Sequence, residues 1–294
     1  MDNRPRPRLA WWRIVGWLVT IAALWYIVQW MRQLDQAVWK SMTDLRMGWL
    51  LLAVGLLQLW FLMRYAAWES IIRRHGLAAE RHVSLKNWTV SELMRYAPGN
   101  IWSFASKYTT SVEHGTTKGQ AVQAMVIEAS AQVSGAAIVA AMMYDVARWW
   151  WVAIAIVAVF PLGLTMVLNI MHRRKADETA QHVSFIEALV LLGWYVLVWV
   201  VFGLATACIA RGFPSVLGGS FLWLAGANVA AWLIGYLSVI TPMGFGVREV
   251  TFVQLVSSTI ANGVASILAL ITRMWFIASE LLFVGFVLLW SKRR

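Results

Sequence analysis

The chain has 294 residues, of which 60% are hydrophobic and 13% are charged, and its mean hydropathy is +0.64. A soluble domain carries roughly 25% charged residues, so this composition excludes an ordinary water-soluble globule. The formal net charge of +11 does not indicate nucleic-acid binding, because the basic residues cluster beside apolar runs and form no nucleic-acid-binding fingerprint, so we expect no nucleic acid as a partner.

Seven apolar runs are long enough to cross about 30 Å of hydrocarbon as helices, which takes about 20 residues each. They are residues 11–30, 47–68, 121–144, 149–171, 185–210, 221–240 and 267–290. Because lipid offers the backbone no hydrogen-bond partners, we predict an all-α polytopic membrane protein. We assign residues 1–10 to a basic cytoplasmic N-terminus, residues 11–290 to one transmembrane domain and residues 291–294 to a basic tail.

Two further segments mix apolar and polar residues and are interrupted by proline and glycine. Residues 84–115 break at Pro98-Gly99, and residues 241–258 open with Thr-Pro-Met-Gly-Phe-Gly-Val-Arg-Glu. Such breaks free backbone groups, which membrane depth tolerates only inside the protein or beside trapped water. The Lys/Arg bias predicts that residues 84–115 dip in and return. Placing both termini in the cytoplasm then needs an eighth crossing, which we assign to residues 241–258.

The two broken segments have a similar spacing of prolines and glycines. Pro98 and Pro242 lie 144 residues apart, as do Gly119 and Gly263. We interpret this match as a diverged internal duplication, although a match this short also arises by chance. Paired segments broken by glycine or proline mark the binding site in many transporters.

Charged residues interrupt several of the apolar runs. Glu128 follows Lys118 by ten residues, or ~15 Å of helix, which places it near the bilayer midplane. Arg273 lies in the last run, and Glu280 follows two turns later on the same face. These groups either contact a polar headgroup or relay a proton, or they form a structural ion pair between helices. Arg64, near the end of its run, is expected to extend to the headgroups.

Both broken segments place arginine beside the break. Arg95-Tyr96 precedes Pro98-Gly99, and Lys107 follows; a helix beginning at Asn100 would point its first N–H groups at the break and attract an anion such as phosphate. In the second segment Pro242, Gly244 and Gly246 interrupt the helix, and Arg248 and Glu249 begin the next one. The alternative for each is a Pro-Gly turn with its charges among the headgroups.

The sequence offers little for metal or cofactor chemistry. All five histidines lie in or beside polar connections, and none is spaced from a cysteine or carboxylate as metal ligands are. We predict no metal and no cofactor. The Gly-x-Gly at residues 244–246 lacks the preceding strand and the third glycine of a nucleotide-binding loop.

Two motifs stand at the breaks, namely Arg95-Tyr96-Ala97-Pro98-Gly99-Asn100-Ile101-Trp102 and Pro242-Met243-Gly244-Phe245-Gly246-Val247-Arg248-Glu249. With them the chain resembles the transmembrane domain of lysylphosphatidylglycerol synthase and its flippase-like relatives. The resemblance covers roughly residues 45–290 and includes a charged position in the last helix, here Arg273. It implies a domain of the bacterial inner membrane that moves an anionic or aminoacylated phospholipid, or a glycosylated polyprenyl phosphate, between leaflets. In the synthase a soluble aminoacyl-transferring domain follows; because this sequence ends at Arg294, we expect no synthetic activity.

The leading hypothesis is therefore a lipid translocase, in which Arg95, Lys107, Arg248 and Arg273 bind a phosphate headgroup while Glu128 and Glu249 pair with them in its absence. The full candidate site comprises Arg95, Tyr96, Pro98, Gly99, Lys107, Glu128, Pro242, Gly244, Gly246, Arg248, Glu249 and Arg273. Two alternatives stay open. One is a membrane-embedded transferase acting on a lipid-linked sugar or phosphate, and the other is a noncatalytic subunit that positions a glycosyltransferase partner.

Overall fold

The computed structural model describes residues 45–97, 101–175, 183–213, 221–238, 242–260 and 262–292. Within these ranges every regular element is a helix, which confirms the predicted all-α membrane class. In chain order the elements are α3 (Met47–Arg74), α4 (Arg81–Leu93), η2 (Met94–Tyr96), α5 (Ile101–Glu113), α6 (Lys118–Lys175), α7 (Phe185–Gly212), α8 (Phe221–Leu237), η4 (Pro242–Gly244), α9 (Val247–Val256) and α10 (Asn262–Ser291). The predicted span at residues 11–30 and the basic N-terminus lie outside the described residues.

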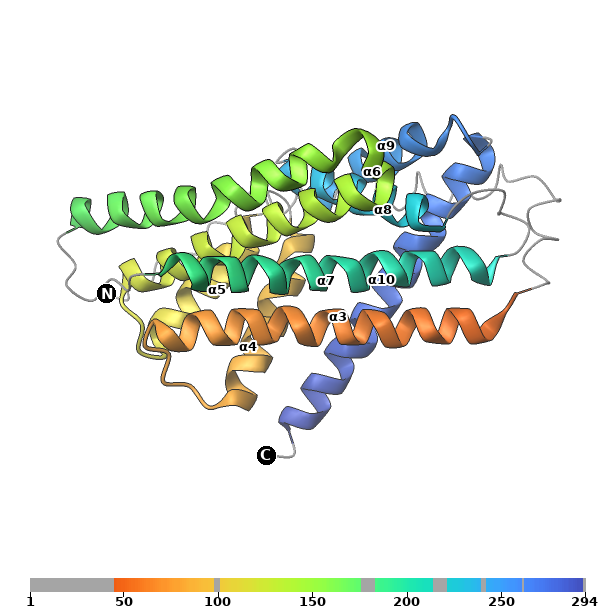
Figure 1. Ribbon diagram of the computed structural model, residues 1–294. Coiled ribbons are helices and arrows are strands. Elements are labelled where there is room, and N and C mark those ends of the chain that lie inside the picture. Colours follow the sequence, from red (N-terminus) through yellow and green to blue (C-terminus); the bar gives the residue numbers. More distant parts are fainter. Residues whose placement is uncertain are drawn as a thin grey trace, which may run out of the picture.

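Two long apolar helices, α3 and α7, pack antiparallel along their whole length (Figure 1). At one end the Arg46 N–H donates to the Gly212 carbonyl at 3.1 Å, and at the other Arg74 forms an ion pair with Glu187 at 2.8 Å. Each helix has 28 residues, or ~42 Å, enough to cross the bilayer. These contacts define two ends of the molecule. The end with Arg74 and Glu187 is called here the His75 end, and the end with Arg46 and Gly212 is called the Asp145 end.

The element α6 consists of two arms joined at Asp145, where φ is −155° and ψ is 86°. The Asp145 Oδ1 accepts a hydrogen bond from the Arg148 N–H at 3.2 Å. Asp145 is therefore the N-cap of the second arm. Figure 1 shows the chain reversing there, so that α6 begins and ends at the His75 end. The two spans predicted at residues 121–144 and 149–171 are these two arms.

The first broken segment forms a hairpin of α4, η2 and α5. Each of the two helices has 13 residues, or ~20 Å, which is too short to cross a membrane. The Ala78 N–H donates to the His114 carbonyl at 2.9 Å, so the segment enters and leaves at one place, beside the end of α3. Residues 84–115 therefore dip in from the His75 end and return, as predicted.

The second broken segment also forms a hairpin, of α8, η4 and α9, and here the predicted eighth crossing at residues 241–258 was wrong. The Tyr144 ring stacks on Trp223, near the start of α8, and its hydroxyl donates to the Leu255 carbonyl, near the end of α9. Both ends of this hairpin therefore lie at the Asp145 end. The physical reason is length: α9 has 10 residues, or ~15 Å, and folds back along the 17-residue α8.

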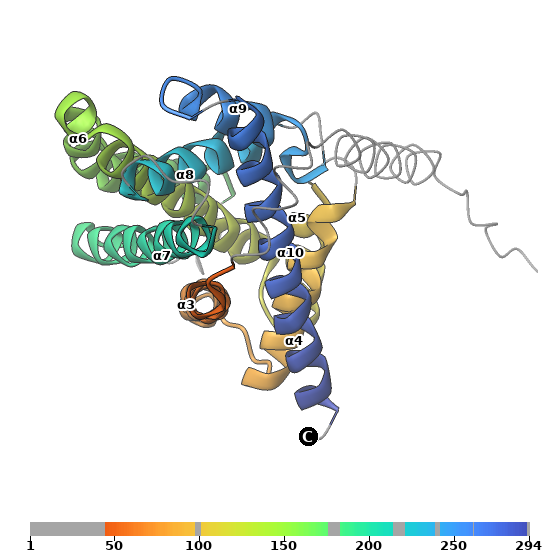
Figure 2. The same ribbon diagram turned by 90° about the vertical axis from the view of Figure 1, so that its right-hand side faces the viewer.

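The two hairpins enter from opposite ends, and their tips η2 and η4 touch in the middle of the molecule. Paired broken segments of opposite direction are the arrangement expected of inverted repeats in transporters, although the duplication itself stays a prediction. The last helix, α10, lies steeply across α3, α6 and α7, which are seen nearly end-on in Figure 2.

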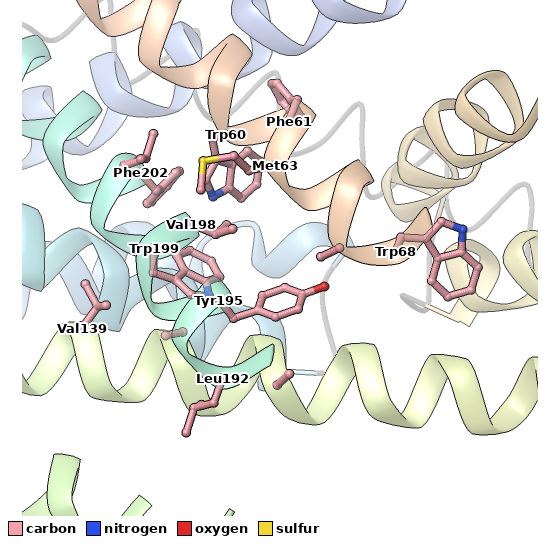
Figure 3. Close-up of a cluster of buried hydrophobic side chains, with 14 of the residues drawn as sticks. Trp60, Phe61, Met63, Trp68, Val139, Leu192, Tyr195, Val198, Trp199 and Phe202 are labelled. Carbon is pink, nitrogen blue, oxygen red and sulfur yellow. The ribbon is translucent and has the colours of Figure 1, made fainter. Parts of the chain in front are cut away.

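An aromatic cluster packs beneath the hairpin tips. Trp60 of α3 and Trp199 of α7 are both 0% exposed and meet edge to face, with ring centroids 6.0 Å apart (Figure 3). Phe202 of α7 and Phe276 of α10 also pack on Trp60, at 5.3 and 5.6 Å. Large rings in close contact resist rearrangement, so the cluster supplies a rigid wall for the polar interior above it.

Candidate functional site

A cavity of about 380 Å³ lies between the hairpin tips. Its walls come from α3, α4, η2, α5, α6, α8, η4 and α9, so both hairpins contribute. The volume falls within the roughly 300–1,000 Å³ of ordinary small-molecule sites. The charged and amide side chains among the lining residues are Arg64, Glu92, Arg95, Lys107, Glu128, Gln132 and Arg248.

Glu92, near the end of α4, is the hub of the charged network. Its carboxylate pairs with Arg64 at 2.7 Å, with Arg95 at 2.8 Å and with Lys107 at 3.0 Å. The residue is 5% exposed. A carboxylate at this depth stays ionised only when cations and hydrogen-bond donors surround it, and here three cations do so.

Lys107 of α5 and Glu128 of α6 form the second buried pair. The Lys107 Nζ donates to both Glu128 carboxylate oxygens, at 2.9 and 2.8 Å, and lies 4.9 Å from the centre of the Trp68 ring. Glu128 is 3% exposed and lines the cavity. The ion pair thus joins the first hairpin to the first arm of α6.

Glu280 of α10 holds the tip of the first hairpin. One of its oxygens accepts a hydrogen bond from the Arg95 guanidinium and the other accepts one from the Tyr96 hydroxyl. Arg95 thereby bridges Glu280 and Glu92, and only 12% of its side chain is exposed. The last helix is consequently attached to the break that begins after Ala97.

The hydroxyl of Tyr96 is expected to contribute measurably to stability. Replacing Tyr96 with Phe leaves one oxygen of the buried Glu280 carboxylate without that donor, which should lower the free energy of unfolding by about 1.5–3 kcal/mol. Denaturation in mixed detergent micelles measures the change. Tyr108→Phe on α5, a partly exposed tyrosine outside the cavity, is the control and should shift it by less than about 0.5 kcal/mol. Equal effects of the two changes would contradict a specific role for the Tyr96 hydroxyl.

Arg248, in the first turn of α9, faces the cavity from the second hairpin. It is 4% exposed, donates to the Asn228 side-chain oxygen at 3.1 Å, and lies 5.8 Å from the ring centres of both Phe202 and Phe276. Asn228 donates in turn to the Thr206 hydroxyl at 2.7 Å. Among the described residues no carboxylate forms an ion pair with Arg248, so this cation is available to an anion in the cavity.

Arg273 lies apart from the cavity. It is 1% exposed, pairs with Glu249 at 3.3 Å and lies 4.0 Å from the centre of the Phe245 ring. Glu249 also accepts from the Gly246 N–H at 2.7 Å and so begins α9. The structure thus places Arg273 and Glu249 behind the tip of the second hairpin, where they connect α9 to α10 and do not line the cavity.

The glycines of the second tip permit its tight turn. Gly244 and Gly246 have φ values of +68° and +82°, in the left-handed region that glycine adopts readily. A Cβ on Gly244 would lie 2.6 Å from the Gly235 Cα, so the tip rests directly on the backbone of α8. Pro242 begins η4, whereas Pro98 and Gly99 lie outside the described residues.

Sequence reasoning missed Glu92 and Gln132 as site residues and interpreted Arg64 wrongly. Arg64 does not extend to the headgroups: it is 3% exposed and pairs with Glu92, and its guanidinium also donates to Gln132 at 3.0 Å. The spacing of Glu92 and Arg95, three residues apart on a helix, was the available signal. Position along a span indicates depth, but it does not indicate which neighbours a side chain meets.

The described residues contain no group of three or more His, Cys, Asp or Glu side chains that could hold a metal ion. The charged groups that line the cavity are mainly guanidinium, ammonium and carboxylate groups in mutual contact. Such a set is suited to binding an oxyanion through charge-assisted hydrogen bonds.

Comparison with known proteins identifies the family. No curated protein and no solved structure matches the chain. The family model described as the lysylphosphatidylglycerol synthase TM region matches residues 13–278, which is most of the sequence and includes both hairpins. The chain therefore belongs to the lysylphosphatidylglycerol synthase transmembrane region family.

Proposed function

We propose that the protein moves a phosphate-bearing lipid between membrane leaflets, with the headgroup in the cavity and the tails in the surrounding lipid. The observation that carries the proposal is Arg248, a buried cation that faces the cavity and has no carboxylate partner among the described residues. A family named for the membrane region of a lipid-modifying synthase supports a lipid as the substrate.

The position of the cavity supports transfer between leaflets. It lies where hairpins from opposite ends of the molecule meet, so a headgroup bound there is midway between the two membrane surfaces. A phosphate at that depth in pure hydrocarbon would be strongly disfavoured, whereas Arg248 and the polar network offer it hydrogen bonds and charge. The protein would thereby lower the barrier that the headgroup meets in crossing.

The rim of the cavity is apolar and faces outward. Ile101 at the start of α5 and Leu237 at the end of α8 both line the cavity, yet they are 64% and 59% exposed. In a membrane these surfaces contact acyl chains. The tails of a bound lipid can therefore stay in hydrocarbon while only the headgroup enters, which suits a cavity of about 380 Å³.

The distribution of basic residues supports an orientation with the His75 end in the cytoplasm of a bacterial inner membrane. Seven basic residues lie at or beside the helix ends there, namely Arg73, Arg74, Arg81, Lys118, Arg173, Arg174 and Lys175. At the Asp145 end the corresponding residues are Arg46, Arg148 and Arg211. Cytoplasmic segments next to spans are enriched in lysine and arginine. The N-terminus, outside the described residues, is proposed to be cytoplasmic for the same reason.

The experiment measures movement of an acyl-labelled fluorescent phosphatidylglycerol in liposomes, with dithionite bleaching the label in the outer leaflet. The wild-type protein should increase the bleached share over protein-free liposomes. Arg248→Gln should slow movement at least about tenfold, because the headgroup loses a hydrogen-bonded ionic partner. Unchanged movement in this variant would remove Arg248 from the mechanism.

The matched control is Arg211→Gln. Arg211, like Arg248, lies over aromatic rings, 5.0 Å from Trp49 and 4.0 Å from Phe221, but it is exposed at the Asp145 end. Its loss should change the rate by no more than about twofold. A new lipid product formed from an added lipid-linked donor, without movement of lipid, would instead favour the membrane-embedded transferase.

A further inference from the structure

The charges of the polar interior can be counted from the described residues. The cations are Arg64, Arg95, Lys107, Arg248 and Arg273, and the carboxylates are Glu92, Glu128, Glu249 and Glu280. Every one of these carboxylates pairs with at least one of the cations. The undescribed stretches beside the tips, residues 98–100 and 239–241, contain no charged residue in the sequence.

Five cations against four carboxylates leave one positive charge, and the contacts assign it to Arg248. The other four cations pair with carboxylates, whereas Arg248 meets, within the described part of the chain, only the neutral Asn228 side chain and two ring faces. An amide dipole and aromatic faces compensate a buried cation only in part. The interior is therefore suited to accept one negative charge.

The charge carried by a headgroup then decides how well it fits. A singly charged phosphodiester brings the interior to neutrality. A phosphomonoester brings a second negative charge, which must compete with Glu92 and Glu128 for Arg64 and Lys107. A zwitterionic headgroup leaves the interior at one positive charge, and a cationic, amine-bearing headgroup raises that excess further. Uncompensated buried charge is costly in each of the last three cases.

We propose that the cavity selects a singly charged phosphodiester headgroup. Arg248, which has no carboxylate partner among the residues described, sets this selectivity by charge balance. The inference rests on the proposed function for the assignment of the cavity to a headgroup. It goes further because it ranks headgroups of different charge, and because it predicts how the ranking changes when one charge is removed from the site.

The experiment measures lipid binding to the full chain by native mass spectrometry in detergent, with four probes of matched acyl chains. The probes are phosphatidylglycerol, phosphatidic acid, phosphatidylcholine and a cationic aminoacyl-phosphatidylglycerol. Wild-type protein should bind phosphatidylglycerol at least about tenfold more tightly than phosphatidylcholine, which corresponds to the lower end for one hydrogen-bonded ionic contact. Equal affinity for all four probes would overturn the proposal.

Variants that shift the charge test the proposal without depending on loss of binding. Arg248→Gln makes the interior neutral and should abolish the preference for phosphatidylglycerol, while binding of phosphatidylcholine is retained. Unfolding cannot produce this pattern, because it would abolish binding of both lipids. Glu128→Gln adds one positive charge and should shift preference toward phosphatidic acid. The double variant restores the original excess, now shared among the three cations around Glu92, and should recover preference for phosphatidylglycerol. A preference that is unchanged in Arg248→Gln, or not recovered in the double variant, would overturn it.

Two further experiments identify the source of the phosphodiester and test selectivity and lipid movement separately. Soluble glycerophosphoglycerol carries the same phosphodiester without tails; if it displaces phosphatidylglycerol at equal concentration, the selectivity holds but the ligand is a free phosphodiester. The dithionite assay on the same protein tests movement. Charge-selective binding without movement would contradict the proposed translocation and support the selectivity. Movement that does not depend on headgroup charge would support translocation and contradict the selectivity.

Discussion

Replacing Glu92 with Ala is expected to lower the free energy of unfolding by about 3–5 kcal/mol, because it removes the carboxylate from a buried ionic network. Lys107 would keep Glu128 and Arg95 would keep Glu280. Among the described residues, Arg64 would retain Gln132 and the faces of Trp60 and Trp88. Arg64 would then be a buried cation without a carboxylate. Denaturation in mixed detergent micelles, with helix content as the readout, measures the loss.

Two companion variants make this result specific. Glu92→Gln keeps the side-chain volume but not the charge, and it should reproduce most of the loss if pairing is the cause. Glu113→Ala removes an exposed carboxylate from the end of the same hairpin and should cost no more than about 0.5 kcal/mol. A loss below about 1 kcal/mol for Glu92→Ala would show that the network does not depend on this residue.

The second large effect is expected at Gly244, where both conformation and space favour glycine. Alanine would carry the left-handed cost of about 1–2 kcal/mol and an overpacking cost of about 1–3 kcal/mol against Gly235, whose Cα and carbonyl oxygen lie 2.6 Å from the added Cβ. The tip of the second hairpin would have to move away from α8, and Arg248 would move with it. We therefore expect Gly244→Ala to lose stability and to slow lipid movement.

Gly246 provides a control two residues away. Its φ is also positive, +82°, but a Cβ there has no neighbour within 4 Å. Gly246→Ala should therefore cost only the left-handed term, about 1–2 kcal/mol, and should leave more lipid movement than Gly244→Ala. Equal losses in the two variants, measured by the same micelle denaturation and dithionite assays, would show that the contact between the tip and α8 has no special importance.

The sequence alone determined the elements that depend on local composition. Runs of about 20 apolar residues have to become helices in lipid, so the spans in α3, both arms of α6, α7 and α10 were predictable. The breaks at both hairpin tips followed from proline and glycine, which interrupt a helix through their own backbone chemistry. The position of Glu128 inside a long helix followed from the apolar run around it.

The tertiary structure decided which charges meet and which segments return. Arg95 and Glu280 are 185 residues apart, and Lys107 and Glu128 are 21 apart, so their pairing depends on how hairpins and helices pack rather than on any local pattern. The turning back of α8 and α9 was missed because the apolar run at residues 221–240 is long enough to cross. In the structure α8 has 17 residues, and the contacts of Tyr144 hold both ends of the hairpin at the Asp145 end. Hydropathy measures the preference of a segment for lipid, whereas the partner of a buried charge is chosen by three-dimensional proximity.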